Sequence, residues 1–570
     1  MLKRFRPVSL ILLVGALGFS GNLYATPMSG IPRVDISQQN AKVSGIVEDA
    51  LGPVTGASVI VKGTTNGTMT DLDGHFTLDN VKKGDIIQIS FIGYTSQDIP
   101  YTGQSEITVK LVEDTQKLDE VVVTALGMKR DKKALGYAMQ ELKGDDLLAS
   151  REPNLANSLS GKVSGLQIVR SSNGVGGSSK IVLRGNNSLT GSNQPLIVVD
   201  GTPMDNFTGG VDDVWGNSGA DMGNGLSDIN PEDIESINML TGPAAAALYG
   251  SQAGNGVILI TTKKGKSQGQ RSISFSTSLM FDKASSLPEM QNRYGVSDGV
   301  DSWGERKDLP KYDNLNDFFS TGVTSITSVS VSHGNEKLQN YFSYANTTGK
   351  GIIDKNRLSK HNITFRETSV IFNNRLKLDG NVNLMRQVSK NKPTVGGFYM
   401  NPLVGLYRFP RGEDLSYYRD NFEVYDESRN LNIQNWHTAY EDFEQNPYWI
   451  TNRIQTKEVR MHAIVSLSAN LQVNDWLTVQ ARGNVDCIDD KVRQKFYAST
   501  APALAGANGR YLEMDYQDHQ FYGDLMLMMK KKWGDFSVNG AFGGSITDKT
   551  TNSTRYDSKT ASLYYANVFT

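Results

Sequence analysis

The segment from residue 270 to residue 570 constrains the fold most, because it consists of long strands joined alternately by short and long links. Apolar and polar residues alternate with a period of two along each strand, which predicts one apolar face and one polar face. Some strands reach ten residues or more, beyond the roughly five or six that are usual in soluble sheets. The clearest rows are Ile273–Phe281, Leu376–Leu384, Ala463–Val473, Leu477–Val485 and Phe536–Phe542.

The link lengths indicate which kind of sheet these strands form. Short links are expected at 334–337, 372–375, 474–475 and 531–535. Long links are expected at about 284–323, 388–457 and 489–517, and a modest one at 348–357. A transmembrane barrel has this asymmetry, because tight turns lie on one side of the membrane and long loops on the other. A soluble sandwich has no reason to place long loops at every second position.

The strand count predicts that the barrel is incomplete. About nine strands are expected before the chain stops at residue 570. The preceding segment, 128–265, should have a radius of gyration of roughly 14 Å, which is too large for the lumen of nine strands. Barrels that hold a plug have about 22 strands. We therefore expect residues 270–570 to form the first part of a larger transmembrane antiparallel β-barrel, and the chain to be a fragment.

The first residues predict secretion. Basic residues at Lys3, Arg4 and Arg6 precede a short apolar run, and small residues follow it, as in a secretory signal. Cleavage is expected between Ala25 and Thr26, which makes 1–25 the signal peptide and 26–40 a linker. The apolar run is too short for a membrane-spanning helix, which needs about 20 residues.

Residues 41–112 predict a small β-sandwich, since short alternating strands are separated by turn clusters about every 8–12 residues. A β-branched run follows within 113–127, opened by two acidic residues and closed by a glycine. On composition alone this run is either an edge strand of the sandwich or a docking strand that pairs with another protein by β-augmentation.

Residues 128–265 have a mixed α/β pattern. Asn154–Leu159 predicts the start of a short helix, and Asn230 followed by Pro231 predicts another, with Asn as the N-cap and Pro in the first position. Strands are expected at Ile181–Leu183, Leu196–Val199 and Val257–Thr262. The overall fold class is therefore mainly β, with one α/β segment between the sandwich and the barrel strands.

Short motifs in these segments give a more specific indication. The plug-like motifs include Leu-Arg-Gly, Val-Asp-Gly, Asn-Pro-Glu-Asp and Leu-Tyr-Gly-Ser, followed by Asn-Gly-Val-Ile. They contain Arg184, Gly185, Asp200, Gly201, Asn230, Pro231, Tyr249, Gly250, Asn255 and Gly256. With these motifs the chain resembles the SusC/RagA-type TonB-linked outer-membrane transporters over almost its whole length from residue 41.

The resemblance assigns a role to each segment. Residues 41–112 look like a carboxypeptidase-regulatory-like domain, 113–127 like a TonB box with its linker, and 128–265 like a plug domain. The box-like residues are Asp119, Glu120, Val121, Val122, Val123, Thr124 and Ala125. On their own, Arg184 and Asp200 are interpreted as residues that organise plug packing.

The resemblance also implies a function. It implies import of a nutrient, an oligosaccharide or a peptide, across the outer membrane of a Gram-negative, Bacteroidota-like cell. The plug and the sandwich would face the periplasm, and the inner-membrane TonB complex would pull on the box to gate the plug. A SusD-like surface lipoprotein is the implied second partner. An iron-chelate or cobalamin receptor of the same superfamily, or a surface adhesin, stays open as an alternative.

Composition and motifs give no indication of an enzyme. The 58 Lys and Arg residues balance 60 Asp and Glu residues, so no large field favours nucleic acid. One cysteine and six histidines form no zinc motif, and no cofactor is expected. Aromatic residues in the long links, among them Trp303, Tyr399, Tyr417 and Trp436, are candidates for stacking on a ligand or for packing the loops.

Overall fold

The computed structural model describes residues 41–49, 52–64, 66–91, 94–111, 121–123, 129–131, 139–149, 151–189, 192–206, 221–240, 243–266, 271–297, 302–394, 399–438, 444–534, 536–559 and 563–569. The expected cleavage site at Ala25 and Thr26 lies outside these residues. The chain divides into two compact units, Met1–Asp119 and Glu120–Thr570. Within the described residues, no helix is long and apolar enough to cross a membrane.

The first unit is the expected β-sandwich. One sheet has the order β4 (His75–Val81), β1 (Ala41–Glu48), β7 (Glu106–Lys110), and the other has the order β3 (Gly67–Met69), β2 (Ser58–Val61), β5 (Ile86–Ser90), β6 (Gln97–Pro100). Alternate residues of both sheets, including Val43, Val59, Leu78 and Ile89, are buried between them. The period-two pattern therefore produces an apolar core with polar outer faces.

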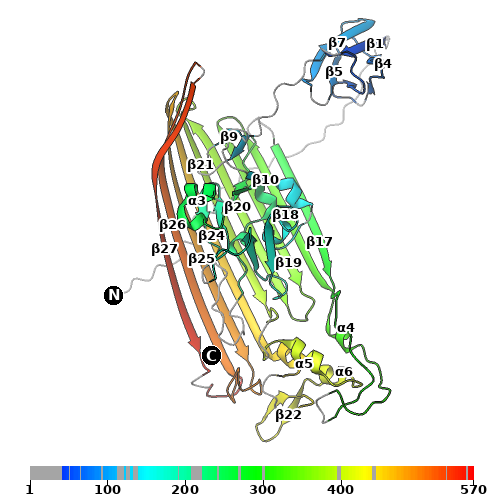
Figure 1. Ribbon diagram of the computed structural model, residues 1–570, viewed down its shortest axis with the longest axis vertical. Helices are drawn as coiled ribbons and strands as arrows, with labels where there is room; N and C mark the ends of the chain where they lie inside the picture. Colours follow the sequence, from blue (N-terminus) through cyan, green and yellow to red (C-terminus); the bar gives the residue numbers. More distant parts are fainter. Residues whose placement is uncertain are drawn as a thin grey trace, which may run out of the picture. The chain divides into compact units, whose positions relative to one another are not determined.

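The second unit is built on a nine-stranded antiparallel sheet, which we call the wall (Figure 1). Its strands follow chain order, and β17 and β27 form its two edges. The strands are β17 (Arg271–Asp282), β18 (Gly322–Gly334), β19 (Leu338–Lys350), β20 (Arg357–Ile371), β21 (Leu376–Lys390), β24 (Ile454–Asn474), β25 (Leu477–Phe496), β26 (Arg510–Trp533) and β27 (Phe536–Asp557). The expected number of strands and the alternation of short and long links are both confirmed.

The wall has one end with short turns and one with long loops, as expected. At the turn end, β20 and β21 are joined through 372–375, and β24 and β25 through 475–476. The loop end carries α4 (Asn314–Phe318), α5 (Pro402–Arg408), α6 (Ser416–Asp420), β22 (Glu423–Asp426), β23 (Leu431–Gln434) and α7 (Pro447–Arg453). The expected boundaries of the third long link, 489–517, were wrong, because β25 continues to Phe496 and β26 begins at Arg510.

That error has a physical reason. The outer face of β25 is apolar from Leu477 to Cys487 and then carries the charged residues Asp489, Lys491, Arg493 and Lys495. The strand continues, but its apolar alternation does not. The apolar part of this face matches the roughly 9–11 residues that a tilted strand needs to cross a bilayer.

The two faces of the wall differ in chemistry. Large apolar side chains are exposed on the outer face, for example Phe275, Phe365, Leu467 and Phe521. The inner face carries buried polar residues, such as Thr364, Asn383 and Asn484. An apolar exterior and a polar interior are typical of a transmembrane barrel, and opposite to a soluble sandwich.

An α/β plug lies against the inner face of the wall (Figure 1). Its sheet has the order β10 (Met139–Lys143), β15 (Ile234–Leu240), β16 (Val257–Thr262), β13 (Leu196–Val199), β14 (Thr202–Met204). A separate hairpin joins β11 (Leu166–Arg170) to β12 (Ser179–Leu183). The helical elements are α1 (Gly144–Leu148), α2 (Leu155–Ser158), α3 (Pro243–Tyr249) and the 3₁₀ turns η3 (Gly225–Asp228), η4 (Pro231–Asp233) and η5 (Gly250–Ala253).

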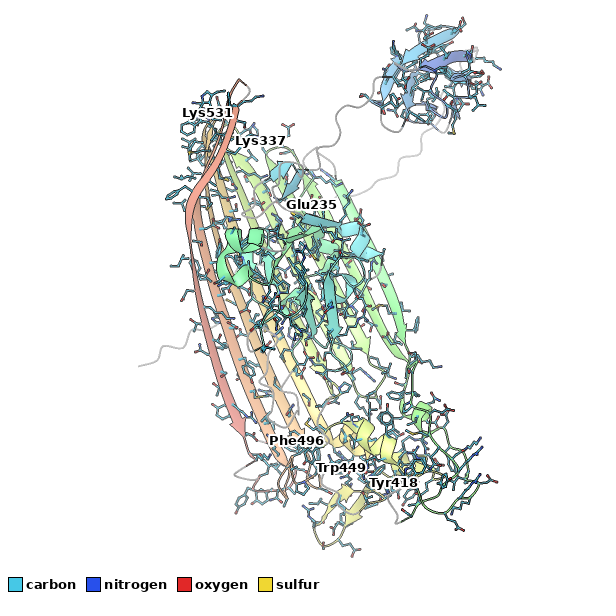
Figure 2. The ribbon with its side chains drawn as sticks, viewed as in Figure 1. Glu235, Lys337, Tyr418, Trp449, Phe496 and Lys531 are labelled. Carbon is cyan, nitrogen blue, oxygen red and sulfur yellow. The ribbon has the colours of Figure 1, made fainter. Side chains whose placement is uncertain are left out.

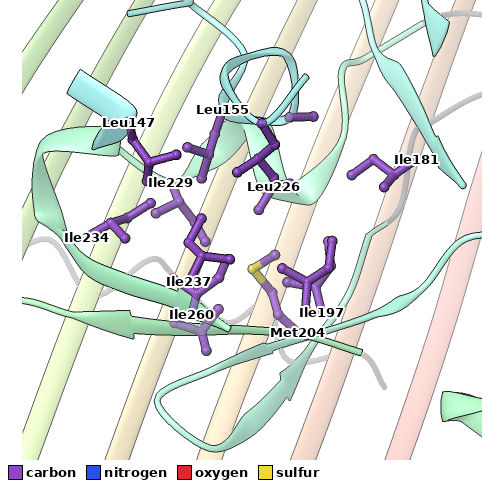
Figure 3. Close-up of a cluster of buried hydrophobic side chains, with 14 of the residues drawn as sticks. Leu147, Leu155, Ile181, Ile197, Met204, Leu226, Ile229, Ile234, Ile237 and Ile260 are labelled. Atoms are coloured by element: carbon purple, nitrogen blue, oxygen red, sulfur yellow. The ribbon is translucent and has the colours of Figure 1, made fainter. Parts of the chain in front are cut away.

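The plug has its own apolar core (Figure 3). Residues from its helices and from one face of its sheet meet there, and Leu155, Leu226, Ile237 and Ile260 are almost fully buried. The cluster also includes Ile464 of β24. Burial of each such side chain contributes about 1.5–3 kcal/mol, so the core stabilises the plug as a unit of its own.

Candidate functional site

The run that resembles a TonB box is described in part. Val121–Val123 forms strand β8, which pairs antiparallel with β9 (Lys129–Asp131) in a two-stranded sheet. Asp119, Glu120, Thr124 and Ala125 lie outside the described residues. The sequence pattern offered no partner for this strand, and the structure supplies one from the same chain. A hairpin of this size is marginally stable alone, so its pairing is easily exchanged.

The plug motifs lie at turns that set the path of the chain. Arg184 and Asp200 both adopt positive φ, at 61° and 49°, each followed by a glycine. The Arg184 side chain is exposed, and its backbone N–H donates to Gly165 O at 2.8 Å. Asp200 has a larger role, because its carboxylate accepts from Thr262 N at 3.0 Å and also reaches the wall.

The remaining motif residues end or begin elements. Asn230 caps η4 by accepting from Glu232 N at 3.2 Å, with Pro231 in the first position. The expected helix start is therefore present, as a single 3₁₀ turn. The helix α3 ends at Tyr249, where Gly250 takes a φ of 70°.

Asn255 and Gly256 fix the entry into β16. The Asn255 amide donates to Ser192 O at 2.7 Å. At Gly256, φ is 93° and a Cβ atom would lie 2.6 Å from Leu183 Cδ2 and 3.0 Å from Leu240 O. Only glycine fits this close approach of strands.

Buried ionic and hydrogen-bonded contacts hold the plug against the wall, and we call these contacts the plug seat. Near the turn end, Arg366 of β20 lies between two carboxylates, 3.0 Å from Asp200 of the plug and 2.8 Å from Asp379 of β21. Lys264, which follows β16, lies 3.0 Å from Asp379. Arg366 is only 4% exposed, so this set is shielded from water.

The centre of the plug seat is a bridge through a histidine. His462 of β24 contacts Asp228 of η3 through Nδ1 at 2.8 Å and Asp486 of β25 through Nε2 at 2.7 Å. Arg460 lies 3.6 Å from the same Asp228 and 2.6 Å from Asp490. Two basic wall residues therefore face one plug carboxylate.

A third set lies toward the loop end. Lys392 forms an ion pair with Glu458 at 2.6 Å and donates to the backbone oxygen of Asp221. The Asp221 carboxylate accepts from the backbone N–H groups of Ser178 at 3.0 Å and Gly223 at 3.1 Å. Burial would raise the pKa of Asp221, but the Lys392 ammonium and these backbone donors hold it below its ordinary value.

Asp233 of η4 forms no ion pair with a described residue and is seated by hydroxyl groups. Its carboxylate accepts from Tyr341 Oη of β19 at 2.9 Å and from Thr364 Oγ1 of β20 at 2.7 Å. Complete burial raises the pKa of Asp233, against the effect of these hydroxyl donors. Plug backbone groups also contribute to the plug seat, since Lys360 Nζ donates to Ser227 O at 2.9 Å.

Two cavities separate the plug from the wall between these contacts. One, of about 240 Å³, lies toward the turn end beside Asp200 and Arg366, with Ser466 and Ser468 on its wall side. The other, of about 310 Å³, lies toward the loop end and is lined by plug residues 170–171 and 174–178 and by strand ends such as Asp282. The plug thus contacts the wall at discrete points and does not fill the space beside it.

The loop aromatics that the sequence singled out fall into two groups. Trp436 packs at 5.5 Å from the Phe409 ring within a buried cluster at the loop end, and Tyr399 packs against a second cluster. Trp303 and Tyr417 stay 72% and 56% exposed. Figure 2 shows the loop end, with Tyr418 and Trp449 labelled there. Packing of the loops therefore explains Trp436 and Tyr399, while Trp303 and Tyr417 can still meet a ligand.

The sequence analysis missed most of the plug seat. Arg366, Arg460, His462 and Asp486 were not singled out for any role, because they make no short motif. The sequence feature that could have identified them is a charged residue on the polar face of a strand with period two, because that face lines the lumen of a barrel. Only the fold showed which residues each of them contacts.

Comparison with known proteins agrees with this architecture. Residues 131–257 match the TonB-dependent Receptor Plug Domain, and residues 43–123 match the CarboxypepD_reg-like domain. The chain is 37% identical over 381 residues to the TonB-dependent receptor SusC of Bacteroides thetaiotaomicron, covering 64% of this chain and 36% of SusC. It is 35% identical over 228 residues to the TonB-dependent receptor P39 of Formosa agariphila, covering 40% of this chain and 20% of P39.

A solved structure has the same fold. The RagAB peptide importer in its open-open state superposes with a TM-score of 0.55 at 18% identity, covering 76% of this chain and 50% of that one. The chain thus spans about a third of the length of SusC and half of the superposed importer chain. In its regulatory-like sandwich, its matched plug and its wall with a polar inner face, the chain is similar to TonB-dependent receptors such as SusC.

Proposed function

We propose that the protein to which this chain belongs imports a nutrient across the outer membrane, and that TonB gates it by pulling on the coupling strand Val121–Val123. The single observation that carries the proposal is the plug seat. A plug with its own apolar core is held in the lumen by ionic contacts that water can replace. Such a plug can be displaced and can return without losing its fold.

The arrangement of the wall supports the position in the membrane. The apolar outer face of β25, from Leu477 to Cys487, is as long as a bilayer crossing requires, about 9–11 residues. In this reading the turn end faces the periplasm and the loop end faces outward, as in barrels of this type. The plug and the sandwich then belong to the periplasmic side, where TonB acts.

The coupling strand supports the partner. Val121–Val123 is a β-branched strand that, among the residues the structure describes, pairs only with β9. A partner with an exposed sheet edge can pair with it through backbone hydrogen bonds, as in β-augmentation. The energy for transport then comes from the partner complex, and this chain supplies the gate.

From the resemblance to SusC/RagA-type transporters we infer that the solute is an oligosaccharide or a peptide, taken up together with a SusD-like surface lipoprotein. The RagAB neighbour is a peptide importer, and SusC is the curated relative with 37% identity. Trp303 and Tyr417 are among the exposed aromatics at the loop end that can meet such a solute.

The experiment introduces Val121→Pro and Val123→Pro into the complete receptor. Proline removes the backbone donors that strand pairing requires, so uptake of labelled oligosaccharide or peptide should stop. The matched control, Val121→Ile with Val123→Ile, keeps strand propensity and should import normally. Undiminished uptake by a proline variant that is inserted normally in the outer membrane would refute the proposal.

A further inference from the structure

The bridge between Asp228, His462 and Asp486 cannot be satisfied by a neutral histidine and two ionised carboxylates. Both ring nitrogens lie at hydrogen-bonding distance from carboxylate oxygens, 2.8 Å on the plug side and 2.7 Å on the wall side. A neutral imidazole has one N–H donor and one acceptor nitrogen, and an ionised carboxylate only accepts. One of the two contacts would then bring two lone pairs together.

The geometry therefore requires two exchangeable protons among the three groups. Either an imidazolium lies between two carboxylates, or a neutral imidazole lies between a carboxylate and a carboxylic acid. In both cases the bridge holds one proton more than a neutral histidine with two ionised aspartates. Water cannot replace that proton, because all three residues are at most 3% exposed.

Cations near the bridge compensate the negative charge of Asp228 but not that of Asp486. Asp228 has Arg460 at 3.6 Å and also interacts electrostatically with Lys360 of β20. Among the described residues, no lysine or arginine forms an ion pair with Asp486. Its second oxygen accepts from the backbone N–H of Asp205, at 3.0 Å. Charge compensation at Asp486 thus depends on the extra proton at His462.

The other charged groups around the bridge form ion pairs with each other. Arg460 is held by Asp490 at 2.6 Å. Lys549 of β27 lies 3.1 Å from Asp518 of β26 and also contacts the Asp205 carboxylate. Glu458, two residues before Arg460 on β24, is paired with Lys392. None of these pairs offers a mobile cation to Asp486 within the described residues.

We propose that the bridge of Asp228, His462 and Asp486 is a proton-binding site that fastens the plug to the wall only while the extra proton is bound. The proposal rests on the function proposed above, in which the plug leaves its seat during transport. Displacement of the plug takes Asp228 away from His462, which removes one of the two carboxylates that hold the proton. The seated plug then binds the proton more tightly than the displaced plug.

Linkage fixes the sign of the effect. Because the seated state binds one proton more tightly, raising the pH favours the displaced state. The opening equilibrium should rise by up to about tenfold per pH unit, the slope for one linked proton, between the pH at which the displaced plug loses the proton and the higher pH at which the seated plug loses it. Above that higher pH it should no longer change.

Hydrogen–deuterium exchange of the whole receptor, corrected for the intrinsic effect of pH, measures this opening. The peptide that contains Leu226–Ile229 reports on the plug side of the bridge. In the native receptor its protection should fall between pH 6 and pH 9. His462→Lys keeps a cation over this range, since the ordinary lysine pKa is about 10.4, and its protection should not depend on pH.

Two further variants complete the test. His462→Gln supplies no cation, so its protection should be low already at pH 6 and should not change with pH. His361→Gln is the matched control, because His361 on β20 contacts Tyr344 and Asn346 of the wall and no plug residue; it should follow the native receptor. Protection of the native plug that is constant from pH 6 to pH 9 would overturn the proposal, whatever the folding of the variants. The readout needs no transport, so a failure here is distinct from continued uptake by the proline variant.

Discussion

The core of the plug and the plug seat are two neighbouring buried regions with opposite chemistry. The core consists of side chains such as Leu155, Ile237 and Ile260, packed without charged residues among them. The plug seat consists of Asp200, Asp228 and their wall partners; Asp228 and Arg460 are buried to a similar extent, and Asp200 is partly buried. Burial alone therefore does not tell the two regions apart.

The difference shows how a plug can be both stable and movable. Apolar burial has a favourable free energy that is lost on contact with water, so the core resists opening. A buried ion pair gains little net free energy, because the attraction is offset by the desolvation of both charges. If water enters the plug seat, it hydrates both charges again and so recovers much of the free energy that their desolvation had cost. The contacts of the plug seat can therefore break while the apolar core keeps the plug folded.

Arg366→Met should have the largest effect on seating. The substitution leaves Asp200 and Asp379 buried near each other without a shared cation, which costs about 3–5 kcal/mol for a broken buried pair. Hydrogen–deuterium exchange of the Thr262 amide, measured in increasing urea, should show that the wall contacts are lost at a lower urea concentration than in the native receptor. Restoring neutrality with Asp200→Asn and Asp379→Asn should recover part of the loss, and no recovery would contradict the electrostatic explanation.

Ile237→Ala should destabilise the apolar core of the plug. Removing a fully buried Ile side chain from the plug core costs about 2–5 kcal/mol, depending on how far the cavity collapses. The exchange of the amides of β15 and of Ile258–Ile260 in β16 should accelerate in this variant and remain close to native in Arg366→Met. Equal acceleration in both variants would mean that core and seat open as one unit.

Acid should loosen the Asp221 contact by a smaller amount. Its pKa is held below the ordinary value, against burial, by Lys392 and by the backbone donors at Ser178 and Gly223. The stabilisation is therefore present above the unfolded pKa of about 3.9 and is lost as the pH falls through the lower folded pKa. Lys392→Met should move this acid transition to higher pH in an exchange experiment between pH 5 and pH 2.5, and an unchanged transition would exclude Lys392 as a cause.

Trp303→Ala and Tyr417→Ala should have the smallest effect on stability. Both side chains are mostly exposed, so the expected change is within about 0.5 kcal/mol. Uptake kinetics distinguish their two roles, because loss of ligand stacking raises KM, while a purely structural surface role leaves KM as in the native receptor. Trp436→Ala serves as the contrasting variant, since it should destabilise the loop cluster.

The regular parts of this architecture could be predicted from residues alone. Period-two alternation identified the rows that became β17, β21, β24, β25 and β27, because side chains on successive residues face opposite sides of a sheet. Asn230-Pro231 marked a helical start through local capping geometry. Fold class and the recognised family followed from these patterns and motifs.

The plug seat could not be predicted in the same way. Asp228 and His462 lie 234 residues apart in sequence, and no local rule connects them. The pairing of β8 with β9 was missed for another reason, since Lys129–Asp131 has no apolar alternation that would mark it as a strand. The true end of β25 was hidden because its last residues are polar on the outer face.

Covalent tethering of the plug tests most directly whether import requires the plug to move. Ser171 of the plug and Asp282 at the end of β17 line the same cavity, so a short bifunctional reagent that forms reducible disulfides can join cysteines placed there, in a background that lacks Cys487. The tethered receptor should stop importing labelled solute and should recover when the tether is reduced, while each single-cysteine variant imports after the same treatment. Import at the native rate by a fully tethered receptor would contradict the account.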